Sequence, residues 1–97
     1  MPLIERRLMS LIEEFTNAQE RVKVLVERPD NLALLQLYSL FKQATAGDAS
    51  TGKKPGMLDF VAKAKYEAWE AHQGKTKDQA MTEYIALVGE LEGKNLK

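Results

Sequence analysis

A chain of 97 residues with 44% hydrophobic residues can bury one core, so we expect a single domain spanning residues 1–97. It contains no cysteine, which excludes disulfide frameworks, thiolate nucleophiles and cysteine-based zinc sites. No run approaches the roughly 18 apolar residues of a membrane span, and the N-terminus lacks the layout of a signal peptide. We therefore expect a cytoplasmic protein without stable membrane insertion.

The net charge is zero, but the charges are unevenly distributed along the chain. Residues 1–41 carry five basic and six acidic side chains, residues 42–77 carry seven and four, and residues 78–97 carry two and four. The positive excess in the middle is too small for the basic surface of a nucleic-acid-binding domain. It is sufficient for one compact polyanion, such as the phosphate groups of a single nucleotide.

Apolar residues recur every three or four positions through most of the chain, which predicts an all-α fold. The residues of the first helical stripe are Leu8, Leu11, Phe15, Ala18, Val22 and Leu25. This first helix should end before Pro29, because proline interrupts a helix. The second helix should run from a cap at Asp30 or Asn31 to about Ala46.

The second half of the chain begins with a glycine-rich connection, residues 47–56, which we expect to be a loop. A third helix should follow over roughly residues 58–72 and stop at Gly74. Thr76 and Gln79 have the spacing of a capping box, so the fourth helix should open there. Helices of this number and length predict a small four-helix bundle.

Catalysis and metal binding are poorly supported by the sequence. Residues 47–54 have the glycine and lysine spacing of a P-loop, but Lys54 replaces the magnesium-binding Ser/Thr and the segment follows a helix rather than a strand. His72 is the only histidine, and no pair of carboxylates stands out. We therefore expect no enzymatic activity, no metal site and no cofactor.

The second helix carries apolar residues well beyond a single stripe, so it needs two apolar neighbours. Its neighbours are either other helices on both sides, which the pattern favours, or a helix and a ligand. Tyr38, Phe41 and Lys42 share one face of this helix. Aromatic rings beside a cation can hold a nucleotide by stacking and by bonds to phosphate.

A similar combination occurs in the third helix, where Lys65, Tyr66 and Trp69 lie close in sequence. Taken separately, Tyr66 and Trp69 are more typical of core residues than of ligand contacts. Both clusters together are suggestive of nucleotide binding without deciding it.

Residues 38–48, Tyr-Ser-Leu-Phe-Lys-Gln-Ala-Thr-Ala-Gly-Asp, resemble the Tyr-Ser-x-Tyr/Phe-Lys-Gln-Ala-Thr-x-Gly-Asp signature of the acyl-CoA-binding proteins. Residues 54–60 and 64–69 resemble the second block of that family, and the similarity extends from about Glu14 to Glu92. The resemblance implies a bundle with an up-down-down-up arrangement of helices. It also implies an intracellular carrier that binds long-chain fatty acyl-CoA non-covalently and forms a pool of it.

The resemblance further implies roles for single residues. Phe41 would pack on adenine, while Lys42 and Lys65 would meet the ribose 3′-phosphate. Tyr38 and Tyr84 would offer hydroxyl groups to the nucleotide end. The complete set of ligand-binding candidates is Lys23, Tyr38, Ser39, Leu40, Phe41, Lys42, Lys65 and Tyr84, and the candidates for the acyl-chain pocket are Ala18, Leu34 and Leu35.

Three positions depart from the family pattern. Phe41 and Tyr66 stand where many relatives have tyrosine and tryptophan, and Val61-Ala62 stands where many carry a lysine. Residues 1–12 lie outside the resemblance, although Leu3 and Ile4 continue the first apolar stripe. This extension, which could prolong the first helix, either packs near the mouth of the pocket or mediates a weak contact, or else it is a frayed terminus.

We expect a monomer whose partner is the acyl-CoA ligand, with no nucleic acid. The rival hypothesis is a helical module that uses the exposed ends of the second helix to dock another protein.

Overall fold

The computed structural model describes residues 10–49, 55, 56 and 58–95. Helices in this part of the chain are α2 (Leu11–Lys23), α3 (Asn31–Ala46), α4 (Phe60–Glu70) and α5 (Lys77–Asn95). The described residues contain no strand, so the prediction of an all-α fold is confirmed. No helix among them is both long and apolar enough to cross a membrane.

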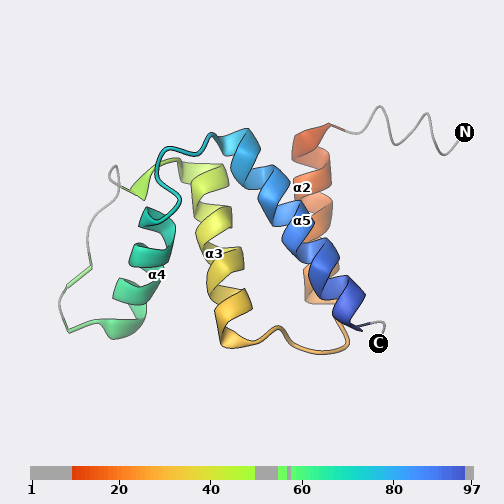
Figure 1. The fold of residues 1–97 in the computed structure, drawn as a ribbon, viewed down its shortest axis with the longest axis horizontal. Helices are drawn as coiled ribbons and strands as arrows, with labels where there is room; N and C mark the ends of the chain where they lie inside the picture. Colours follow the sequence, from red (N-terminus) through yellow and green to blue (C-terminus); the bar gives the residue numbers. More distant parts are fainter. Residues whose placement is uncertain (1–9, 50–54, 57, 96–97) are drawn as a thin grey trace, which may run out of the picture.

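The helices form a row in which α2 packs against α5, α5 against α3, and α3 against α4. Figure 1 shows that α3 and α4 run in the same direction, whereas α2 and α5 run in the opposite one. This is the expected up-down-down-up arrangement. Parallel helices cannot be joined by a tight turn, and α3 accordingly ends at the opposite edge of the bundle from the start of α4 (Figure 1).

The start of α2 differs from the prediction. Ser10 has an extended backbone (φ −71°, ψ 161°), its Oγ accepts from the Glu13 N–H at 3.1 Å, and its own N–H donates to Glu13 Oε1 at 3.3 Å. This capping box starts α2 at Leu11, three residues after the first member of the predicted apolar stripe. Residues 1–9, including Leu8 of the predicted stripe, lie outside the described residues.

The bounds of α3 and α4 and the start of α5 agree with the prediction to within two residues, whereas α2 ends at Lys23, six residues before Pro29. Asp30 caps α3 through a 2.8 Å bond from the Ala33 N–H. Asp59 caps α4 in the same way, which delays its start to Phe60. Thr76 and Gln79 exchange the two expected capping bonds, at 3.0 and 2.9 Å.

The main core lies between α2, α3 and α5. Its buried members are Phe15, Ala18, Leu37, Leu40, Ala44, Ala80, Tyr84, Val88 and Leu91. A smaller cluster of Ala49, Tyr66 and Trp69 lies between α4 and the start of the long connection, which confirms that these two aromatic residues are core residues. Since α4 contacts only α3 among these helices, one flank of α3 is covered by a single neighbour.

Part of the family signature has a structural role at the end of α3. The Nε2 group of the fully buried Gln43 donates to Asp48 Oδ1 at 2.9 Å and to the Lys75 carbonyl at 2.8 Å. Asp48 Oδ1 also accepts from the Gly74 N–H, and Trp69 Nε1 donates to the Gly47 carbonyl at 2.7 Å. These bonds fasten the start of the connection to α4 and to the turn before α5.

Candidate functional site

Two lysines are held over aromatic rings where α3 and α4 meet. Lys65 Nζ lies 5.2 Å from the centre of the Tyr38 ring, and Lys42 Nζ lies 4.9 Å from the centre of a Trp69 ring. A cation over an aromatic face is stabilised by about 0.5–1 kcal/mol at an exposed site. Both ammonium groups are therefore positioned by neighbouring rings, and Lys65 is exposed while Lys42 is half-buried.

Three aromatic rings join α2, α3 and α5 beside these lysines. The half-buried Phe41 ring stacks on Phe15 at 6.1 Å, and the Phe15 ring meets Tyr84 edge to face at 5.0 Å. Among the described residues the Tyr84 hydroxyl has no hydrogen-bond partner, and burial raises the pKa of this group. Phe15 was predicted only as a core residue, because its helical spacing carries no signal for a site.

An apolar groove runs between α3 and α4 with a volume of about 660 Å³. Its walls are formed by Arg28, Asn31, Leu34, Leu35, Tyr38, Phe60, Val61, Ala64 and Lys65. Because α3 and α4 are parallel, Tyr38 and Lys65 lie at one end of the groove. At the other end, near the first turns of the two helices, Phe60 and Val61 lie with Arg28 and Asn31. We call it the α3–α4 groove.

Four of the candidate residues are not brought to this site. Ser39 and Leu40 are buried, and they lie about 200° and about 100° around the helix axis from Phe41. Ala18 is wholly inside the core. Lys23 lies eight residues beyond Phe15, about 12 Å along the helix, and its ammonium group pairs with Glu20 at 2.8 Å.

Comparison with known proteins decides the family. The model of the family described as "Acyl CoA binding protein" matches residues 12–88. The chain belongs to the acyl-CoA-binding protein family. It is 51% identical over 76 residues to the acyl-CoA-binding protein homolog of Drosophila melanogaster, covering 78% of this chain and 87% of that protein.

Further relatives agree with this assignment. The chain is 46% identical over 83 residues to the acyl-CoA-binding protein of Brassica napus, covering 86% of this chain and 89% of that protein. The crystal structure of Oryza sativa acyl-CoA-binding protein 2 superposes with a TM-score of 0.82 at 38% identity, covering 90% of this chain and 94% of that one. The predicted family and its arrangement of helices are thus confirmed.

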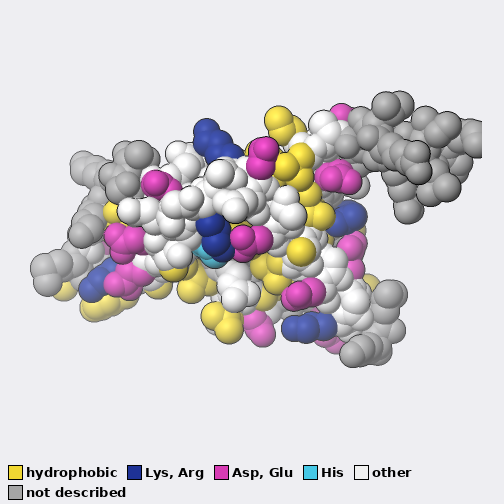
Figure 2. All heavy atoms as spheres, turned by 45° about the horizontal axis from the view of Figure 1, so that its top comes forward, with side chains coloured by type: hydrophobic (Ala, Val, Ile, Leu, Met, Phe, Trp, Pro, Cys, Tyr) yellow, Lys and Arg dark blue, Asp and Glu magenta, His cyan; other side chains and the backbone are white. Residues whose placement is uncertain are grey.

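This member of the acyl-CoA-binding protein family also has a polar cluster on another face, where Figure 2 shows the histidine beside a basic and an acidic side chain. His72 Nε2 lies 3.1 Å from Ser39 Oγ, and Lys75 Nζ lies 3.0 Å from His72 Nδ1. Lys75 also pairs with Glu83 at 2.7 Å. A serine beside a histidine raises the question of a nucleophile and its base.

The directions of these hydrogen bonds argue against that chemistry. An ammonium group can only donate, so Nδ1 of neutral His72 accepts from Lys75 and the ring proton is on Nε2. Nε2 therefore donates to Ser39, whose hydroxyl in turn donates to the Gln36 carbonyl at 2.9 Å. In this arrangement the imidazole cannot accept the serine proton, and Ser39 is only 1% exposed.

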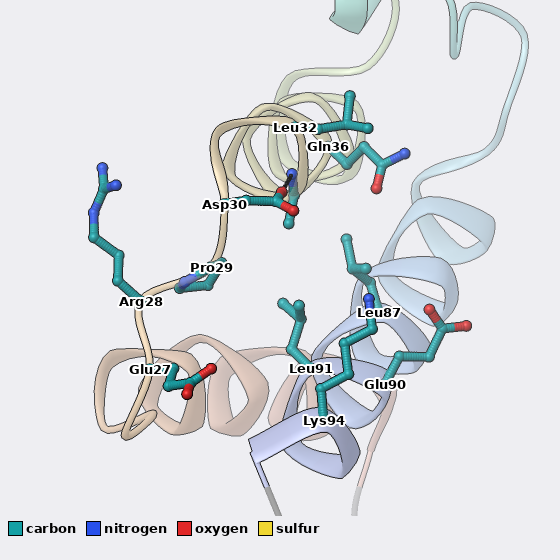
Figure 3. A pocket seen from close by; sticks show the side chains of 11 residues that line it. Glu27, Arg28, Pro29, Asp30, Leu32, Gln36, Leu87, Glu90, Leu91 and Lys94 are labelled. Atoms are coloured by element: carbon teal, nitrogen blue, oxygen red, sulfur yellow. Dashed lines mark hydrogen bonds between the residues drawn. The ribbon is translucent and has the colours of Figure 1, made fainter. Parts of the chain in front are cut away.

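Two further hollows offer no clear ligand chemistry. The one in Figure 3 lies between the α2–α3 connection and the end of α5, and charges of both signs surround it. The other lies beside His72 and is lined mostly by leucine and alanine side chains from α3, α4 and α5. The described residues contain no group of three side chains that could hold a metal ion.

The His72 cluster predicts a pH dependence of stability. Burial, and then the nearby Lys75 ammonium, lower the pKa of His72 from its ordinary value of 6.5. Below pH 6.5 His72 takes up a proton more readily in the unfolded chain than in the folded chain. The contribution of neutral His72 to the free energy of unfolding is therefore complete above pH 6.5 and is lost as the pH falls. The free energy of unfolding in urea should therefore decline more steeply with acid in the natural protein than in His72→Gln.

The comparison with His72→Gln isolates one group, since glutamine keeps a hydrogen-bonding side chain but does not titrate. Asp48 does not affect this comparison near pH 6.5. The hydrogen bonds from the Gly74 N–H and then from Gln43 lower the pKa of Asp48 below 3.8, so its contribution to the free energy of unfolding is lost only in stronger acid. Identical pH profiles of the two proteins near pH 6.5 would contradict the prediction.

Proposed function

We propose that this protein binds a long-chain fatty acyl-CoA non-covalently and carries it unchanged. The observation that supports this most directly is that the α3–α4 groove combines the ammonium group of Lys65, which lies over the Tyr38 ring, with walls formed mainly by apolar side chains. An acyl thioester of coenzyme A has the same two parts, a polyanionic nucleotide and an alkyl chain. Proteins named for acyl-CoA binding are also among the relatives of this chain.

The nucleotide half would be held by cations and rings. In this proposal Lys42 and Lys65 bond to phosphate, and Phe41 packs on the adenine. The hydroxyl of Tyr84, which has no partner among the described residues, is a further donor, and the Tyr84 ring meets the Phe15 ring on which Phe41 stacks. A ligand in this position would touch α3, α4 and α5 at once, so the site forms only when these three helices pack together.

The acyl half would lie in the α3–α4 groove. Leu34, Leu35 and Ala64 line its middle, and Phe60 and Val61 line its far end. Each methylene that leaves water contributes about 0.8 kcal/mol before the cost of ordering the chain. Val61, which departs from the lysine of many relatives, makes this end of the groove more apolar.

We further propose that residues 1–97 act as one cytoplasmic, monomeric domain in which residues 1–12 are an extension, and that no catalytic step occurs. The family match begins at residue 12, which supports a separate status for the extension. The absence of a catalytic step is supported by the hydrogen bonds around Ser39, because His72 donates to the Ser39 hydroxyl and the hydroxyl donates to the Gln36 carbonyl.

Calorimetric titration with octanoyl-, dodecanoyl- and hexadecanoyl-CoA tests the proposal, with free CoA and free hexadecanoate as controls. Affinity should rise by up to about tenfold for each two added carbons until the groove is filled. Each fragment should bind far more weakly than the intact long thioester. An affinity that does not depend on chain length would refute the groove, and no saturation with any thioester would favour a protein-docking module.

A further inference from the structure

The α3–α4 groove carries a positively charged side chain at each of its two ends. Lys65 lies beside Tyr38 at one end, and Arg28 lies beside Asn31 at the other, which we call the far end. The walls between them are mainly apolar, and no carboxylate of the described residues lines the groove. An elongated ligand in this groove would therefore meet a cation at both of its ends.

The course of the chain before α3 explains how Arg28 reaches the groove. Proline disfavours a helical conformation in the residue that precedes it, so Arg28 lies outside the helices, just before Pro29. The α2–α3 connection brings it to the edge of the bundle where α3 and α4 both begin (Figure 1). In Figure 3 its side chain extends away from the hollow between this connection and the end of α5.

The carboxylates near this edge have other positions and other partners. Glu27 and Asp30 line the hollow of Figure 3, and neither lines the α3–α4 groove. Asp30 and Asp59 accept capping bonds at 2.8 and 3.1 Å, where the positive ends of the helix dipoles partly offset their charge. Arg28 forms no ion pair within the described part of the chain, so its guanidinium group can pair with an anion from outside.

We propose that the α3–α4 groove accepts acyl-CoA whose acyl chain ends in a second carboxylate, the thioesters of α,ω-dicarboxylic acids, and that Arg28 binds this terminal carboxylate. The inference rests on the proposed function, which places a phosphate of CoA at Lys65. Arginine presents a planar fork of N–H donors that matches the two oxygens of a carboxylate. Asn31, the first residue of α3, adds an amide donor beside it.

The far end suits a charged group better than a closed apolar pocket would. A methyl group gains free energy by leaving water, whereas a carboxylate that leaves water without a partner is strongly disfavoured. Arg28 and Asn31 are exposed, so a carboxylate paired with them would keep part of its hydration. The methylenes before it would still lie against Leu34, Leu35 and Ala64 in the middle of the groove.

Calorimetric titration with dodecanedioyl- and hexadecanedioyl-CoA, each compared with its monocarboxylic counterpart, tests the proposal through Arg28→Leu. At the length whose end reaches Arg28, the variant should bind the dicarboxylic ligand about fivefold more weakly, the upper limit for an exposed ion pair. It should bind dodecanoyl- and hexadecanoyl-CoA at least as well as the natural protein does. Retained binding of these two ligands also shows that the variant is folded.

Lys63→Leu is the matched control, because it replaces an exposed cation near the start of α4 with the same residue. Lys63 does not line the groove, so this variant should bind all four ligands as the natural protein does. Equal losses in the two variants would mean that overall charge, rather than Arg28, attracts the dicarboxylic ligands. That result would overturn the proposal.

Two further measurements separate an ion pair from a general tolerance of polar groups. The loss in Arg28→Leu should shrink as the salt concentration rises, since exposed charges are screened. The affinity for 16-hydroxyhexadecanoyl-CoA, which has a neutral polar end, should respond much less to Arg28→Leu. An equal loss for the hydroxyl and carboxylate ligands would overturn the assignment of an anion to the far end.

The failure of this inference can be told apart from the failure of the proposed function. If Arg28→Leu binds the dicarboxylic ligands of both lengths as the natural protein does, while the monocarboxylic thioesters bind normally, only the role of Arg28 is overturned. If the natural protein binds none of the thioesters, the proposed function and this inference are both overturned.

Discussion

Replacing Lys65 with alanine should weaken the binding of hexadecanoyl-CoA by between about tenfold and about a hundredfold. The range follows from the roughly 1.5–3 kcal/mol that a hydrogen bond to a charged group contributes. The Lys65 ammonium is already positioned over the Tyr38 ring, so little ordering is needed when a phosphate arrives. Calorimetric titration of both proteins with the same ligand measures the effect.

Lys63→Ala is the matched control, because it removes an exposed lysine from the same helix. Residues two apart lie about 200° apart around a helix, so Lys63 points away from the groove that Lys65 lines. A ligand without the 3′-phosphate adds a second arm. If Lys65 bonds that phosphate, Lys65→Ala should lose little further affinity for the dephosphorylated ligand, and an undiminished loss would assign the lysine to another group.

Replacing Phe15 with alanine should lower the free energy of unfolding by about 3–5 kcal/mol, the usual cost of truncating a buried phenylalanine. Its ring is 4% exposed and contacts both Phe41 and Tyr84, so the change would leave a cavity where α2, α3 and α5 meet. The loss is a large share of the about 5–15 kcal/mol that stabilises a typical domain. Urea unfolding followed by helical circular dichroism measures it.

Phe60→Ala provides the control with the same chemical change, since the Phe60 ring is 74% exposed. Its effect on the free energy of unfolding should stay within about 0.5 kcal/mol. Equal losses in the two variants would mean that Phe15 does not pack as described. A Phe15→Leu variant, which refills most of the cavity, should recover part of the stability and allow ligand binding to be measured on a folded protein.

Local patterns predicted the helices well, because caps and apolar spacing act over a few residues. Asp30 and Thr76 cap their helices as expected, and Gly47 ends α3 with a φ of 83° that favours glycine. At the start of α2 the apolar spacing alone extended the predicted stripe back to Leu8, whereas the capping box of Ser10 and Glu13 starts the helix at Leu11. Where two local signals conflict, hydrogen bonds at the cap can outweigh periodicity.

The candidate site was predicted in composition but not in arrangement. The signature over residues 38–48 mixes two kinds of residue that the sequence does not separate. Tyr38, Phe41 and Lys42 face the candidate site, whereas Gln43 and Asp48 fasten the long connection. Ser39 lies inside the same run, yet its hydroxyl bonds to Gln36 and His72 on another face.

The sequence by itself determined the fold class, most helix boundaries, the family and the residue types that could hold a nucleotide, because these depend on short-range spacing and on similarity along the chain. Only the tertiary structure decided that Phe15 stacks on Phe41, that Lys65 lies over Tyr38, and that Ser39 is turned away from both. It also decided that Arg28 and Asn31 lie at the far end of the α3–α4 groove. The physical reason is that these contacts depend on the parallel course of α3 and α4 and on the row in which the helices pack, and such long-range packing has no period along the sequence.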